Sequence, residues 1–133
     1  MNPKDTRIII IDDWEEQIDR LKRALNDLGY TNLQTCLFDY DEFIEASFSI
    51  EGYIPLSPNS IVLLDEGLSS DNLYTGTDLR KDILKEIPFA GTLTFASISG
   101  DKCPGWAEHH FGLKARLGMP DVVTKFEQFM LSL

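Results

Sequence analysis

The residues most able to do chemistry in this sequence stand directly after short apolar runs. Asp12 and Asp13 follow four consecutive isoleucines, and Asp65 follows the run Ile61-Val-Leu-Leu. Three carboxylates meeting at one point would repel one another and be partly protonated unless a cation joined them. Oxygen ligands of this number suit a hard ion such as Mg²⁺. The three aspartates therefore predict a magnesium site.

A fold that brings strand ends together is needed to assemble such a site. Short apolar runs alternate with helical patterns along the whole chain, which predicts a parallel α/β sheet with helices on both faces. Ligands bind such open sheets outside the carboxyl ends of the strands. Five strands are expected, and the residues at or directly after their ends include Asp12, Asp65, Ser97 and Lys114. The expected strands are residues 8–11, 33–38, 61–64, 93–96 and 111–113.

Helical spacing of apolar residues predicts the helices between these strands. One begins near Trp14 and ends at Gly29, a residue suited to a left-handed helix end. Asp39 or Asp41 could cap a second helix, and Pro120 is expected to open the last one. Pro104 would interrupt any helix before Lys114, so the fourth helix should be short or irregular. The expected buried residues of these helices are Ile18, Leu21, Leu25, Leu28, Phe43, Ala46, Phe48, Leu79, Ile83, Ile87, Val122, Phe126, Phe129 or Met130, and Leu133, and residues 49–60 are expected to form a long connection.

Length and composition restrict the class of protein. The 133 residues fit a single domain, residues 1–133. The net charge of -10 opposes binding to a nucleic-acid backbone. Cys36 and Cys103 lack metal-ligand spacing and are expected to be reduced, packed thiols. No signal-peptide pattern or membrane-length apolar run occurs, so we expect a cytoplasmic protein without nucleic-acid or membrane partners.

These features together resemble the receiver domain of response regulators in two-component signalling, the CheY-like family, over the whole chain. The stretch Arg7-Ile-Ile-Ile-Ile-Asp-Asp-Trp-Glu-Glu-Gln-Ile is similar to the family's first strand, acid pair and first helix. Ile61-Val-Leu-Leu-Asp is similar to the phosphoacceptor strand, and Gly76-Thr-Asp-Leu to the start of the third helix. Thr94-Phe-Ala-Ser and Phe111-Gly-Leu-Lys are similar to the strands that end in a hydroxyl residue and a lysine. The resemblance implies a flavodoxin-like (βα)5 fold.

The resemblance also implies roles for individual residues. Asp65 would accept a phosphoryl group from a phosphohistidine. Ser97 would donate a hydrogen bond to the phosphoryl group, and Lys114 would pair with its charge. The expected ligands of the cofactor Mg²⁺ are Asp12, Asp13, Asp65 and the backbone carbonyl of Gly67, and the expected switch aromatic is Phe111.

The implied biology is that of a phosphoacceptor and not of a conventional enzyme. A histidine kinase or histidine phosphotransfer protein would be the donor. A downstream protein, which the sequence does not identify, would be the target. No organic cofactor is expected.

Each role has a simpler structural alternative. Either residue of the acid pair could cap the helix that follows, and Asp65 could belong to a turn. Ser97 could bond to the backbone at its strand end, and Phe111 could be ordinary core. His109 and His110 have no suitably spaced third ligand nearby and are expected to be surface residues that face opposite ways.

The sequence departs from the receiver pattern in several places. Glu66 adds a carboxylate beside Asp65, Ile98 stands where the family has a small residue, and Ala115 replaces the usual proline. The connection from Asp65 to Gly76 is also longer than usual. These departures leave open a second hypothesis, a pseudo-receiver that binds a protein partner without accepting phosphate.

Two enzyme classes share part of this pattern. An FMN protein of flavodoxin type has the same topology, but the acid pair would repel the FMN phosphate. A phosphatase of the haloacid-dehalogenase type has its second acid two positions after the first, where this sequence has Trp14.

Overall fold

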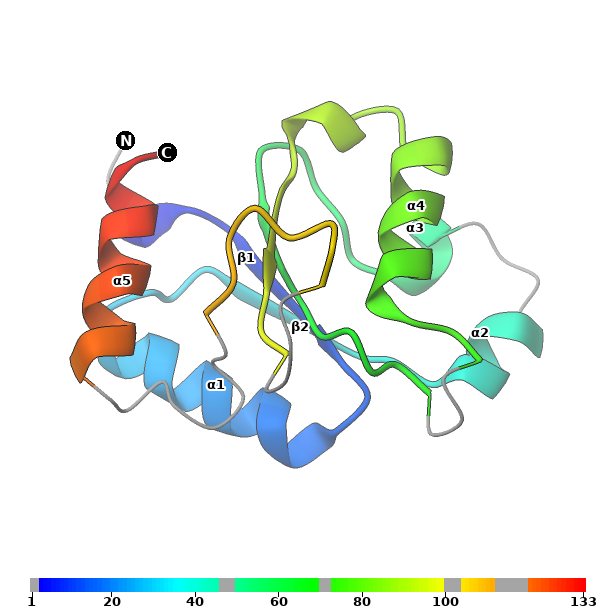
Figure 1. Cartoon of the computed structure of the whole chain (residues 1–133), viewed down its shortest axis with the longest axis horizontal. Coiled ribbons are helices and arrows are strands. Elements are labelled where there is room, and N and C mark those ends of the chain that lie inside the picture. Colours follow the sequence, from blue (N-terminus) through cyan, green and yellow to red (C-terminus); the bar gives the residue numbers. More distant parts are fainter. Residues whose placement is uncertain (1–2, 46–49, 70–72, 100–103, 112–119) are drawn as a thin grey trace.

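A parallel sheet of four strands, in the order β2-β1-β3-β4, forms the centre of the protein (Figure 1). The computed structural model describes residues 3–45, 50–69, 73–99, 104–111 and 120–133. The strands are β1 (Ile8–Asp12), β2 (Leu33–Leu37), β3 (Ile61–Leu64) and β4 (Thr94–Ser97). The chain runs outward from β1 to β2 and then crosses to β3 on the other side of β1. This reversal makes the carboxyl ends of β1 and β3 the point where a ligand site is expected.

The predicted fifth strand is not confirmed. Ser97 and His110 form one isolated parallel bridge. The Ser97 N–H donates to the carbonyl of His109 at 2.8 Å, and the Phe111 N–H donates to the carbonyl of Ser97 at 3.0 Å. The chain around residue 110 therefore lies beside β4 at this point, and residues 112–119 lie outside the described part of the chain.

Helices cover both faces of the sheet, as Figure 1 shows. On one face lie α1 (Glu15–Asp27) and α5 (Pro120–Leu131), which pack against the same core cluster. On the other face lie α2 (Tyr40–Glu45), α3 (Ile50–Tyr53) and α4 (Gly76–Glu86). Two 3-10 turns, η1 (Pro3–Asp5) and η2 (Ala90–Thr92), precede β1 and β4. This is the doubly wound α/β arrangement that the sequence predicts.

The isoleucines of β1 hold the two layers together. Ile8 and Ile10 pack toward α1 and α5, whereas Ile9 and Ile11 pack toward α3 and α4. All four side chains are 0% exposed. Burying each one contributes roughly 1.5–3 kcal/mol relative to leaving it in water. The expectation of a central strand covered on both faces is confirmed.

Local sequence signals set the helix ends. Gly29 follows α1 with φ of 99°, a left-handed conformation that glycine adopts without strain. The Asp39 carboxylate accepts a hydrogen bond from the Glu42 N–H at 3.0 Å and so caps α2. Helix α5 begins at Pro120, as predicted. In the segment before Lys114, residues 104–111 contain turns and no helix, which agrees with an irregular fourth helix.

Two predictions are wrong, one about the connection at residues 49–60 and one about the burial of Leu133. Residues 50–53 form α3 within the expected connection, because Ile50 and Ile54 find an apolar site against α4. Leu133 was expected to face inward but is 59% exposed, because α5 ends at Leu131 and Leu133 lies beyond the helical spacing that would turn it inward. Ala46 and Phe48 lie outside the described residues.

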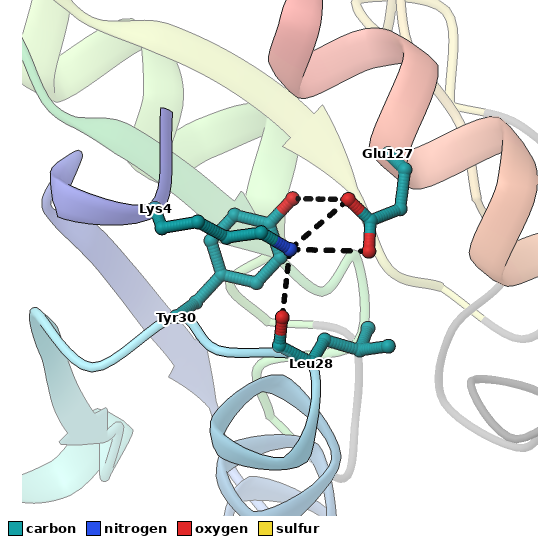
Figure 2. A network of polar contacts seen from close by, with 4 residues as sticks. All are labelled: Lys4, Leu28, Tyr30 and Glu127. Carbon is teal, nitrogen blue, oxygen red and sulfur yellow. Dashed lines mark hydrogen bonds and ion pairs between the residues drawn. The ribbon is translucent and has the colours of Figure 1, made fainter. Parts of the chain in front are cut away.

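A polar network closes the amino end of the sheet (Figure 2). Lys4 Nζ donates to the Leu28 carbonyl at 2.7 Å and pairs with the Glu127 carboxylate at 3.1 Å. The Tyr30 hydroxyl donates to the same carboxylate at 3.0 Å, and the Lys4 ammonium lies 4.0 Å from the centre of the Tyr30 ring. The network joins the start of the chain to α1 and α5 and leaves the opposite edge of the sheet to the candidate site. Every helix in the described ranges is too short or too polar to traverse a lipid bilayer.

Candidate functional site

The three predicted acidic residues come together at the carboxyl ends of β1 and β3. One carboxylate oxygen from each of Asp12, Asp13 and Asp65 lies within 4.8 Å of the other two. The pairing of Ile11 with Leu64 places the aspartates that follow at the same edge of the sheet. The Asp65 N–H donates to the Ile11 carbonyl at 3.2 Å and continues that pairing. The sheet register itself assembles the cluster.

Burial makes this cluster a good fit for a metal cation. Asp12 is 0% exposed and Asp65 is 1% exposed, while Asp13 is exposed. Buried carboxylates at this spacing require a compensating positive charge or a proton. The all-oxygen donor set suits Mg²⁺.

Neither member of the acid pair is the cap of α1. The N-cap position is occupied by Trp14, whose side chain makes no capping hydrogen bond. The Asp13 N–H donates to the Asp12 carboxylate at 2.7 Å, which holds the pair together ahead of the helix. The capping alternative is wrong for these two residues.

Two glycines allow the backbone to approach Asp65 closely. A methyl group at Gly67 would lie 3.7 Å from Oδ2 of Asp65, so this backbone runs beside the carboxylate. Gly67 pairs with Thr75 as an antiparallel bridge. A methyl group at Gly76 would lie only 2.5 Å from the Asp65 carbonyl oxygen. Gly76 therefore permits α4 to start against Asp65, and the role of the Gly67 carbonyl as a ligand stays a prediction.

Glu66 is held by the start of α4. Its carboxylate accepts hydrogen bonds from the Thr77 N–H at 2.6 Å and from the Thr77 hydroxyl at 2.7 Å. The Gly76 N–H donates to the Glu66 carbonyl at 2.9 Å. A carboxylate at a helix N-terminus is stabilised by the free N–H groups and by the helix dipole. The sequence departure at Glu66 thus has a local structural explanation.

Ser97 lies fully buried at the end of β4 and contacts His110, for which the sequence predicts no role in the site. Its hydroxyl oxygen accepts a hydrogen bond from the Ser99 N–H at 3.2 Å and lies 2.9 Å from Nδ1 of His110. The alternative of a strand-end bond to backbone is therefore confirmed. His109 and His110 were both expected at the surface, and both are half-buried.

Phe111 and Ile98 belong to the core between the sheet and α5. The Phe111 ring is 7% exposed and lies 5.4 Å from the Phe126 ring and 5.1 Å from the Phe129 ring, measured between ring centres. Ile98 is fully buried in the same cluster. The switch role of Phe111 stays a prediction. Lys114 and Ala115 lie outside the described residues.

Alternation along the chain could have indicated His110. Phe111 and His109 both pack toward α5, so the side chain between them points to the other face, where its bridge partner Ser97 also points. The predicted opposite orientation of the two histidines is confirmed. The sequence could not supply the pairing with β4, because that contact joins residues thirteen positions apart.

A hollow of about 310 Å³ opens beside the acidic cluster. Its walls include three aspartates, which give it a negative field that attracts cations. The lining residues are Asp13, Phe38, Asp39, Tyr40, Asp41, Leu68, Ser69 and Leu73. A hollow of about 660 Å³ at the amino end of the sheet contains none of the predicted site residues.

Comparisons with known proteins support the fold. No family model and no curated protein matches the chain. The N-terminal domain of a response regulator/sensory box/GGDEF three-domain protein from Carboxydothermus hydrogenoformans is similar in structure, with a TM-score of 0.57, 17% identity and 94% of each chain covered.

A second similar structure is a chain that fuses the trimeric coiled coil of yeast Spc42 to another structure. Its TM-score is 0.53 and its identity is 20%, and the match covers 96% of this chain and 64% of that one. This chain therefore spans less than two thirds of the fusion. At these identities the two matches show the fold alone, a parallel α/β sheet with helices on both faces.

Proposed function

We propose that this chain is a receiver domain that accepts a phosphoryl group on Asp65 in a Mg²⁺-dependent reaction. The observation that carries the proposal is the convergence of the Asp12, Asp13 and Asp65 carboxylate oxygens within 4.8 Å, with Asp65 buried at the end of a central strand. The structural similarity to the N-terminal domain of a response regulator adds support. The cytoplasm is the proposed compartment.

The chemistry of this proposal follows from the residues at the strand ends. A carboxylate oxygen of Asp65 attacks the phosphorus of a phosphohistidine, the P–N bond breaks, and the imidazole leaves with the bonding electrons. Asp12, Asp13, Asp65 and the Gly67 carbonyl would hold Mg²⁺, which when bound offsets negative charge on the phosphoryl oxygens. The Ser97 hydroxyl donates a hydrogen bond to the phosphoryl group, and Lys114 pairs with its charge.

The proposed partners follow from this reaction. A histidine kinase or a histidine phosphotransfer protein would supply the phosphoryl group, and a protein target would recognise the phosphorylated state. The product is an acyl phosphate on the chain itself, and its hydrolysis regenerates the carboxylate. The chain is therefore proposed as a phosphoacceptor with no separate substrate to turn over.

The first part of the test is metal binding. Trp14 is 49% exposed and directly follows Asp13, so its fluorescence should respond when Mg²⁺ binds. The titration uses a Trp106→Phe variant, which leaves Trp14 as the emitting tryptophan. Asp13→Asn should weaken Mg²⁺ binding, whereas Asp19→Asn on the exposed side of α1 should leave it unchanged. No Mg²⁺ response would refute the metal site.

The second part of the test is phosphorylation. With Mg²⁺ and a small phosphodonor, the intact mass of the wild type and of Asp19→Asn should rise by one phosphoryl group. Asp65→Asn should show no gain, because the amide is not a nucleophile toward phosphorus. Equal mass gain in Asp65→Asn would place the acceptor elsewhere.

A pseudo-receiver is the second candidate function. The observation that favours it is the Ser97 hydroxyl, which already contacts Ser99 and His110. This candidate predicts a Mg²⁺ response in the Trp14 titration without any mass gain that depends on Asp65.

A further inference from the structure

His110 contacts the one hydroxyl that the proposed phosphoryl site uses. Its Nδ1 atom lies 2.9 Å from the Ser97 hydroxyl oxygen, a full hydrogen-bond contact. We propose that His110 is a positioning residue that competes with the phosphoryl group for the hydrogen of the Ser97 hydroxyl. The inference rests on the proposed function, because it concerns how Ser97 serves an acceptor at Asp65.

The backbone around His110 is fixed on both sides. The carbonyl of His109 and the N–H of Phe111 both bond to the backbone of Ser97. The His110 carbonyl accepts a hydrogen bond from Lys125 Nζ on α5 at 3.0 Å. Partners in a parallel bridge point their side chains to the same face, so the His110 ring is directed at Ser97 by the sheet pairing itself.

The hydrogen-bond capacity of Ser97 defines the competition. A serine hydroxyl has one hydrogen to donate, and its oxygen can accept two bonds. The oxygen already accepts the Ser99 N–H at 3.2 Å. Ser97 is 0% exposed, so its hydroxyl hydrogen must find an acceptor inside the protein. Among the described residues the atom that lies within reach as an acceptor is Nδ1 of His110, at 2.9 Å, so we assign His110 the tautomer with its hydrogen on Nε2.

Donation to His110 and donation to a phosphoryl oxygen are therefore mutually exclusive. In the resting state the Ser97 hydrogen is bonded to Nδ1, and phosphorylation requires it to turn toward the phosphoryl group. The half-buried His110 ring can then take a hydrogen bond from water in its place. His110 thereby weakens binding of the phosphoryl group by the strength of one net hydrogen bond.

The test measures the affinity for beryllofluoride, a phosphoryl mimic, in the presence of Mg²⁺. His110→Phe keeps a ring but removes the acceptor, and it should tighten binding by about two- to twelvefold, the range of one net hydrogen bond. His110→Asn places an amide atom at the same number of bonds from Cα as Nδ1 and should restore an affinity near that of the wild type. His109→Phe is the matched control, because that ring packs against Phe129, and its affinity should be unchanged.

A double-mutant cycle separates this role from a structural one. In a Ser97→Ala background the His110→Phe substitution should have no effect on beryllofluoride affinity. An equal effect in that background would overturn the inference, as would unchanged or weaker binding by His110→Phe alone. If no variant binds beryllofluoride, the proposed function fails and the inference fails with it.

A measurement on the unaltered protein guards against variants that fold poorly. The imidazole ¹⁵N signals of wild-type His110, recorded at mildly alkaline pH, should show a proton on Nε2 and a hydrogen-bonded, unprotonated Nδ1. Adding Mg²⁺ and beryllofluoride should change the Nδ1 signal as the Ser97 hydrogen leaves. A proton on Nδ1 in the resting protein would overturn the inference.

Discussion

The Glu66 carboxylate points to Thr77 at the start of α4, although Glu66 directly follows the candidate phosphoacceptor Asp65. The Thr77 N–H lies 2.6 Å from one carboxylate oxygen, and its hydroxyl lies 2.7 Å from the other. Thr75 completes this helix start with a capping box that includes Asp78. The residue after β3 and the first turn of α4 are thus one hydrogen-bonded unit.

Removing the Glu66 carboxylate should therefore destabilise the fold. Glu66→Ala is expected to lower the free energy of unfolding by about 1–2 kcal/mol, as for the loss of a helix cap. Glu66→Gln keeps an acceptor oxygen and should cost less. Urea unfolding measures both changes, with Glu86→Ala at the exposed far end of α4 as the control. An equal loss in Glu86→Ala would contradict the assigned contact.

Gly76 should tolerate no side chain. A Cβ at this position would lie 2.5 Å from the Asp65 carbonyl oxygen and 3.1 Å from the Glu66 Cα, both backbone atoms. Gly76→Ala is expected to lower the free energy of unfolding by about 1–3 kcal/mol and to weaken Mg²⁺ binding, because the Asp65 backbone must move. A Cβ at Gly91 would have no atom within 4 Å, so Gly91→Ala should change stability by less than about 0.5 kcal/mol. Thermal unfolding and the Trp14 titration compare the two variants, and equal effects would refute the close approach.

The strand ends could be predicted from sequence because they depend on local signals. Ile8 to Ile11 form a continuous buried run that stops at Asp12, and the parallel register then brings Asp12 and Asp65 to one edge. A parallel sheet with this topology leaves little choice about where those two carboxylates lie. The cluster of Asp12, Asp13 and Asp65 could therefore be predicted from the sequence alone.

The hydrogen-bond partners of the site could not be predicted from the sequence in the same way. The contact of Ser97 with His110 depends on sheet pairing at one bridge, and the contact of Glu66 with Thr77 depends on the path of a loop. Helix α3 was missed because four residues carry too short a pattern to distinguish a helical turn from a loop. Local propensity does not encode such contacts, since tertiary packing selects them.

The Lys4 network should contribute modestly to stability. Lys4 and Glu127 side chains are each 33% exposed, so solvent screens their ion pair. Lys4→Met is expected to lower the free energy of unfolding by about 1 kcal/mol, chiefly because the hydrogen bond to the Leu28 carbonyl is lost. Lys22→Met on the exposed side of α1 serves as the control, with urea unfolding at low and high salt as the measurement. A loss above roughly 3 kcal/mol, or one equal to that of the control, would contradict this account.

Cys36 should make stability fall at alkaline pH. Burial raises the pKa of its thiol to about 11, and the nearby negative charge of Glu42 adds to the rise. An unfolded thiol titrates near pKa of about 8.5, so above that pH the unfolded chain releases a proton that the folded chain retains. The folded state then binds more protons, and its stability decreases as the pH rises from about 8.5 toward 11.

The size of this loss at about pH 10 is roughly 2 kcal/mol relative to neutral pH. Two proteins are compared by urea unfolding: a Cys103→Ser variant and a Cys103→Ser/Cys36→Ala variant. Their difference gives the part of the stability loss that is due to the Cys36 thiol. The Cys36→Ala chain lacks the titrating thiol, so the stability gap between the two should shrink by about that amount between pH 7 and pH 10. Parallel pH curves would show that the Cys36 thiol titrates alike in both states and is not protected by burial.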